Sequence, residues 1–66
     1  MESLQMQKDL IQLFKAYGMT KDQVIGTMLM LKDKKNQKLM MKWIKKNTAA
    51  TIEEVITEAE RLYKNL

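Results

Sequence analysis

Hydrophobic residues recur at helical spacing in four separate segments of the chain. In the first segment they follow the i, i+3, i+4, i+7 pattern of one helix face, at Leu10, Leu13, Phe14 and Tyr17. Residues 24–31 are apolar nearly all round, whereas residues 52–66 carry one continuous apolar stripe. No segment alternates apolar and polar positions with β-branched residues, as strands do. The pattern predicts an all-α fold, a compact bundle of four short helices at about 3–17, 21–32, 36–46 and 52–65.

Capping residues set the predicted limits of the first two helices. Ser3 has a side chain that accepts from the free amides of a first turn, so it is the predicted N-cap of the first helix. Gly18 follows the last apolar position of that helix, where a left-handed residue often ends a helix. Thr20 and Gln23 have the spacing of a capping box, in which each side chain bonds the other residue's backbone amide. The second helix should therefore begin directly after Thr20.

The third and fourth helices have comparable signals. Asp33 and Asn36 are both candidate caps for the start of the third helix. Asn47 follows its last turn and is expected to adopt the left-handed conformation that stops a helix. Thr51 and Glu54 form a second capping box, which predicts the start of the fourth helix.

The apolar stripes of the four segments predict a shared core. Trp43 lies on the side of the third helix opposite its lysines, so its indole should pack between helices. The residues expected to be largely buried are Leu10, Phe14, Tyr17, Val24, Met28, Leu31, Trp43, Ile44, Ile56, Ala59, Leu62 and Tyr63.

The length and composition restrict the classes of protein to consider. A chain of 66 residues is long enough for a single helical domain, taken here as 1–66. A domain of this size is expected to have a stability of only about 3–5 kcal/mol. The chain contains neither cysteine nor histidine, so disulfides and metal sites built from thiolates or imidazoles are excluded.

The residues that commonly carry catalysis are missing or isolated. Ser3 is the only serine, and there is no histidine to activate it. Glu53 and Glu54 are adjacent carboxylates, but they lie at a helix start, where capping and the helix dipole explain them. Gly18 and Gly26 stand alone and form no phosphate-binding loop. We therefore predict a protein that is not an enzyme, with no catalytic residue, metal, cofactor or small-molecule substrate.

No segment of the sequence predicts a membrane location. The longest uninterrupted apolar run is 28–31, far below the roughly 20 residues needed to span a bilayer. Residues 1–12 are too polar for the core of a signal peptide. By default, the expected location is cytoplasmic, with no membrane partner.

The net charge of +4 is distributed unevenly along the chain. Residues 1–31 are neutral, residues 32–46 contain seven lysines and one aspartate, and residues 47–66 carry four glutamates against two basic residues. All the excess positive charge therefore lies in the middle of the chain, in the predicted third helix and the residues just before it.

The lysines of the third helix are predicted to share one side of it. At about 100° per residue, six of them fall within an arc of about 120°, and Met41 lies at the edge of this arc. Because like charges four residues apart repel, an exposed surface usually mixes signs, and this one does not. The face is either an ordinary solvated surface or, as we predict, a partner-binding surface. This lysine face consists of Lys34, Lys35, Lys38, Lys42, Lys45 and Lys46, with Met41 at its edge.

Two kinds of anionic partner fit the lysine face. The first is an acidic protein surface, either on another protein or on a second copy of this chain. In the latter case the contact would use the acids of the fourth helix, Glu53, Glu54, Glu58 and Glu60. We predict on this basis a small binding or assembly module.

The alternative partner is DNA or RNA, because a helix, a short turn and a basic helix have the outline of a helix-turn-helix. Lysine contacts phosphate well but reads base edges poorly by itself. Asn36 and Gln37 are expected to point away from the lysine face, which itself has no arginine. Nucleic-acid binding would therefore rest mainly on backbone contacts. No motif in the chain identifies a protein family.

Overall fold

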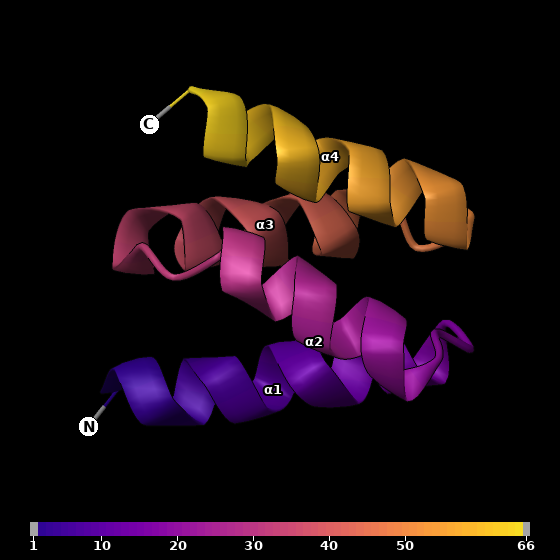
Figure 1. Cartoon of the computed structure of the whole chain (residues 1–66), viewed down its shortest axis with the longest axis horizontal. Coiled ribbons are helices and arrows are strands. Elements are labelled where there is room, and N and C mark those ends of the chain that lie inside the picture. The colour runs from indigo at the N-terminus through magenta and orange to yellow at the C-terminus, as the bar shows by residue number, and fades with distance from the viewer. Residues whose placement is uncertain (1, 66) are drawn as a thin grey trace.

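The computed structural model describes residues 2–65 and consists, over that range, of four α-helices without a strand (Figure 1). They are α1 (Glu2–Ala16), α2 (Lys21–Met30), α3 (Lys34–Lys46) and α4 (Ile52–Lys64). The predicted all-α bundle of four short helices is thus confirmed. Every observed boundary lies within two residues of its predicted position.

The four helices form a ring of contacts. α1 packs against α2 and α3, and α4 packs against the same two helices. α2 and α3 are diagonally opposed, with α2 crossing the front of the molecule in Figure 1 and α3 lying behind it. Consequently α2 and α3, although separated by only three residues, expose their outer surfaces on opposite sides of the bundle.

The turn between α1 and α2 follows the local signals closely. Gly18 has φ +92°, its N–H donates to Lys15 O at 2.9 Å, and the N–H of Met19 donates to Phe14 O at 3.3 Å. These two bonds form a Schellman motif, and the buried Met19 and Phe14 supply its hydrophobic contact. The capping box predicted at Thr20 is present, as is the one at Thr51.

Two capping predictions at other helix ends were wrong. α1 begins at Glu2, so Ser3 lies inside the first turn and is not the cap. Asn47 has φ −124°, outside the left-handed region, because its side-chain amide donates to Trp43 O at 2.8 Å while its backbone N–H bonds Ile44 O. The carbonyls at the end of α3 are thus satisfied without a left-handed residue. Tyr17 Oη donates to Asn47 O at 3.2 Å and connects this end of α3 to α1.

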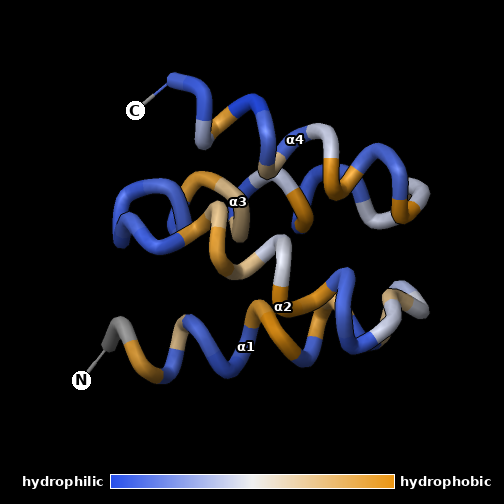
Figure 2. Tube along the Cα trace, viewed as in Figure 1, coloured by the Kyte–Doolittle hydropathy of each residue, from blue (hydrophilic) through white to orange (hydrophobic). Residues whose placement is uncertain are grey.

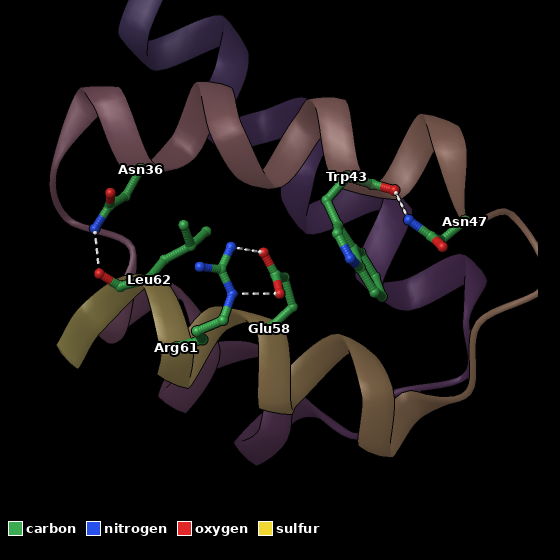
Figure 3. Close-up of polar contacts among 6 residues, drawn as sticks. All are labelled: Asn36, Trp43, Asn47, Glu58, Arg61 and Leu62. Carbon is green, nitrogen blue, oxygen red and sulfur yellow. Dashed lines mark hydrogen bonds and ion pairs between the residues drawn. The ribbon is translucent and has the colours of Figure 1, made fainter. Parts of the chain in front are cut away.

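The start of α3 shows which of the two candidate caps is used. Asp33 accepts hydrogen bonds from the backbone N–H groups of Lys35 at 2.7 Å and Asn36 at 3.4 Å, so the helix starts at Lys34. Asn36 is not a cap: it is buried and donates from Nδ2 to Leu62 O at 3.1 Å (Figure 3). Both Asp33 and the buried amide therefore have structural roles at this corner of the bundle.

Two buried amides of α3 connect it to the ends of other helices. Leu62 O lies in the last turn of α4, where it accepts from the C-cap N–H of Asn65 at 3.3 Å, and Leu31 is the C-cap of α2. Carbonyls at a helix end lack the regular partner four residues further on. Asn36 donates to the first, and Gln37 donates from Nε2 to the second at 2.7 Å. The expectation that both side chains turn away from the lysine face is confirmed, because they point into the bundle.

The core is continuous through the bundle. Its buried apolar residues are Leu10, Phe14, Met19, Val24, Leu31, Met40, Ile44, Val55, Ala59 and Leu62. Tyr17, Met28, Trp43 and Ile56, which were also predicted to be buried, are only partly buried and pack against this core. The prediction for Tyr63 was wrong, since its side chain is 53% exposed. Tyr63 lies on a flank of α4, about 80° around the helix from the buried Val55, and no helix covers that flank.

Candidate functional site

All six lysines of the lysine face are exposed, and Met41 at its edge is half-buried. Their orientation follows from the opposite side of α3, where Met40 and Ile44 are buried in the core. The lysine face is therefore a real surface of the folded chain, as the helix count predicted.

The charges of the lysine face are not neutralised by any side chain of residues 4–65. The one ion pair among these side chains joins Arg61 Nη2 to Glu58 Oε2 at 2.6 Å, and none of their carboxylates lies within 4 Å of a lysine Nζ. Three pairs of lysines on the face are four residues apart, starting at Lys34, Lys38 and Lys42. Each such pair opposes helix formation by a few tenths of a kcal/mol. The fold itself thus gains nothing from collecting these charges.

The lysine face borders a groove on each side of α3. Lys45 and Met41 line a groove of about 640 Å³ against α1, together with Met6, Asp9 and Leu13. Lys35, Lys42 and Lys46 line a second groove of about 690 Å³ against α4. We call the second one the basic groove. The seven predicted site residues are therefore divided between two grooves, with Lys34 and Lys38 on the ridge between them.

Two apolar side chains line the basic groove beside its lysines. Leu39 is 39% exposed, and Trp43 is half-buried with its indole directed into the space between α3 and α4 (Figure 3). From the sequence, Trp43 was predicted to lie in the core, and Leu39 was not predicted as a site residue. Helix spacing could have indicated that both belong to the site, because both lie next to Lys42 and Lys46 on the helix surface.

The α4 wall of the basic groove contains a paired arginine and glutamate. Arg61 donates from Nε to Glu58 Oε1 at 2.9 Å and from Nη2 to Oε2 at 2.6 Å (Figure 3). These hydrogen bonds, and the negative charge of Glu58, raise the pKa of Arg61 above its ordinary value. Because this charge is matched by Glu58, the net positive charge of the groove comes from Lys35, Lys42 and Lys46, which outnumber Asp33, the other acid in its lining.

The four glutamates of α4 do not form the single acidic surface that was expected. The Glu58 side chain is only 11% exposed and engaged by Arg61, and Glu54 closes the capping box by accepting from Thr51 N–H at 2.9 Å. Glu53 and Glu60 are exposed and lie on the opposite flank of α4 from Glu58. Glu54 and Glu58 thus accept hydrogen bonds within the fold, whereas Glu53 and Glu60 remain on the surface.

The fold and the site together describe a four-helix protein whose third helix carries an uncompensated basic surface. Among residues 2–65, no helix is long and apolar enough to cross a membrane, and no three carboxylates gather into a group suited to a metal ion. Comparison with protein-family models, with curated proteins and with solved structures gives no match to this chain.

Proposed function

We propose that this protein is a non-enzymatic binding module that holds an acidic, partly apolar segment of another protein in the basic groove. The observation that carries the proposal is that Lys35, Lys42 and Lys46 line the same groove as the exposed Leu39 and the half-buried Trp43. A helix or extended peptide with acidic and apolar residues would meet both sets of side chains at once. Burial of the indole supplies contact area, and the lysines orient the partner and speed its approach.

Several features favour a protein segment over nucleic acid. Asn36 and Gln37, which could pair with base edges, are buried and bonded to backbone carbonyls. The one arginine near the site is held by Glu58. α2 and α3 are diagonally opposed and not packed on each other, which gives the helix-turn-helix alternative no support. What remains for nucleic acid is phosphate contact by lysine, which is salt-sensitive and carries little sequence information.

The single tryptophan makes the proposal directly testable. The probe is a synthetic helical peptide with glutamates and leucines at i, i+3 and i+4, titrated while Trp43 fluorescence is recorded. We expect a shift of the emission to shorter wavelength, because the peptide excludes water from the half-buried indole. Binding should weaken as salt is added, since the lysines are exposed and their charges are screened.

A matched pair of variants separates the site from the overall charge. Lys38→Glu/Lys42→Glu should keep the helical circular dichroism spectrum and lose peptide binding. Lys8→Glu/Lys15→Glu changes the net charge by the same amount on α1 and should still bind. If both double variants bind equally, the lysine face is only a solvated surface.

Duplex DNA, titrated under the same conditions, tests the alternative. A DNA-binding protein should show a logarithmic salt slope of about −0.9 per phosphate neutralised. Tight DNA binding together with no binding of the acidic peptide would overturn the proposal in favour of the nucleic-acid function.

A further inference from the structure

Most of the exposed large hydrophobic side chains lie away from the lysine face. In the described part of the chain there are five, and four of them are Leu4 (53% exposed), Ile25 (49%), Leu29 (56%) and Tyr63 (53%). Figure 2 shows most of α2, which crosses the front of the molecule, in orange and pale colours. Exposed apolar residues gathered on one surface are typical of an interaction site.

The centre of this surface is a groove between α1 and α2. Ile11, Ile25, Met28 and Leu29 line it, and its volume is about 360 Å³. Gln37 also lines it, and Gln37 Oε1 is the one buried side-chain oxygen or nitrogen of the described residues without a hydrogen-bond partner. We call this the apolar groove.

The rim of the apolar groove is basic. Lys32 lines it, and Lys21 is four residues before Ile25 on the same side of α2. On α1, Lys8 and Lys15 stand three residues before and four residues after Ile11. All four lysines are exposed, and none has a carboxylate within 4 Å among the side chains of residues 4–65; Asp22, exposed and three residues before Ile25, is the one acid on the same side of α2, so the lysines are in excess. A complementary partner therefore combines apolar and acidic residues.

This chain itself carries such a surface. Glu53, Ile56, Glu60 and Tyr63 follow the spacing i, i+3, i+7, i+10, which places them on one flank of α4. Glu53, Glu60 and Tyr63 are exposed, and Ile56 is half-buried. We call these four residues the acidic strip. Its apolar side chains match those of the apolar groove, and its glutamates are opposite in charge to the lysines of the rim.

The acidic strip and the apolar groove lie on the same side of the molecule. The other flank of α4, with Glu58 and Arg61, faces α3 in the basic groove, so the acidic strip is on the flank toward α2. α2 packs against both α1 and α4, and it lies in front of them in Figure 1. The groove on one side of α2 and the strip on the other side therefore flank the same exposed helix.

We propose that the occupant of the apolar groove is the acidic strip of a second copy of this chain, in a two-fold symmetric dimer. With the symmetry axis near α2, the strip of each copy meets the groove of the other, so both contacts form at once. A closed, isologous contact of this kind uses the same patch on both subunits and does not extend into a filament. The lysine face, on the opposite side of the bundle, stays exposed in both copies.

The size of the surface is adequate for such a dimer. A standard interface buries about 800 Å² on each partner. The whole molecule has an accessible surface of 4751 Å² and its Cα trace extends 27 × 24 Å in the view of Figure 1, so one face of the molecule can supply this area.

Sedimentation equilibrium of the full chain over a range of concentrations tests the dimer. We expect a species of twice the monomer mass of 7.8 kDa. Leu29→Glu should weaken the dimer about tenfold or more, because it places an acid where the acidic strip docks. Leu39→Glu is the matched control: it changes an exposed leucine of α3, on the lysine-face side, and should leave the dimer unchanged.

A charge exchange tests the pairing itself. Lys32→Glu and Glu60→Lys should each weaken the dimer alone, whereas an equimolar mixture of the two variants should recover it, since each groove then meets an oppositely charged strip. A wild-type chain that stays monomeric, a dimer weakened by Leu39→Glu and not by Leu29→Glu, or a mixture without recovery each overturns the proposal. Peptide binding at Trp43 is read separately, so failure here leaves the proposed function of the basic groove intact.

Discussion

α2 and α3 occupy equivalent places in the bundle but expose opposite kinds of surface. Each packs against α1 and α4, and each has one side in the core and one side in solvent. The outer side of α2 carries Ile25 and Leu29, whereas the outer side of α3 carries six lysines. The packing of the bundle requires neither choice, because both sets of side chains point away from it. Under the two proposals made above, both outer surfaces form contacts outside the single chain.

On their inner sides the contrast is reversed: the buried side of α3 is more polar than the buried side of α2. α2 buries Val24 and Thr27, and its C-cap Leu31 is buried as well; only Thr27 is polar, and its hydroxyl donates to Gln23 O at 2.7 Å. α3, the more polar helix overall, buries two amides, Asn36 and Gln37. Burial therefore does not follow hydropathy residue by residue. It follows which groups find a partner once the helices are in contact.

The largest change in stability is expected for a substitution on the inner side of α3, and it should clearly exceed that for the edge of its outer side. Met40 is fully buried, so Met40→Ala should lower the free energy of unfolding by about 2–5 kcal/mol, enough to unfold much of a domain of this size. Met41→Ala, at the neighbouring half-buried position, should cost clearly less. Urea denaturation followed by circular dichroism measures both, and equal losses would contradict the orientation of α3.

The next effect concerns the buried amides. Asn36→Ala removes the buried donor to Leu62 O and leaves that carbonyl only its bond from Asn65 N–H at 3.3 Å, which should cost about 0.5–1.5 kcal/mol. Asn65→Ala, an exposed position near the same end of α4, serves as the control in the same denaturation experiment. A loss no greater than that of the control would show that the amide bond adds nothing to the packing of α3 on α4.

A substitution on the outer side of α2 is expected to have a smaller effect, and to raise the stability of the monomer. Gly26 has no neighbouring atom within 4 Å of the position of an added Cβ, and its φ is not positive. Gly26→Ala should therefore stabilise the monomer by about 0.5–1 kcal/mol through helix propensity alone. Thermal unfolding in dilute solution, where the chain is monomeric, measures this gain. A loss of stability would mean that α2 has a close neighbour at Gly26.

The smallest change in stability is expected for a substitution within the lysine face. Its sign distinguishes a surface that serves binding from one that stabilises the fold. Lys42→Glu replaces two like-charge pairs, with Lys38 and Lys46, by opposite-charge pairs, so unfolding should require a few tenths of a kcal/mol more. Denaturation at low salt reveals the gain, and high salt should remove it. A destabilised variant would show instead that the Lys42 side chain contributes packing along the basic groove.

The features that were predicted correctly from the sequence depend on residues that lie close together along the chain. The capping boxes at Thr20 and Thr51 and the left-handed Gly18 were predictable because each involves bonds between residues at most five positions apart. The lysine face was equally accessible, since the arc that it occupies follows from helix geometry alone. Ser3 and Asn47 were assigned wrongly because several residue types can satisfy a helix end, and the choice among them is not local.

Features that join separate helices could not be predicted in the same way. The basic groove exists because α4 packs beside α3, which brings Arg61 and Glu58 opposite Trp43 and Leu39. Tyr63 belongs to the apolar stripe of α4, yet it is exposed because no helix covers its flank. An apolar stripe specifies a side of a helix, but its width does not say how much of that side a neighbour reaches.

By itself, the sequence determined the four helices, most of their caps and the side on which the lysines lie, because these depend on backbone hydrogen bonds and side-chain spacing within one or two turns. Only the tertiary structure decided that Asn36 and Gln37 are buried, that the acids of α4 are divided between its two flanks, and that α2 exposes its apolar outer side. The physical reason is that helix-end carbonyls gain distant donors, and helix flanks gain or lose neighbours, only when the helices pack together.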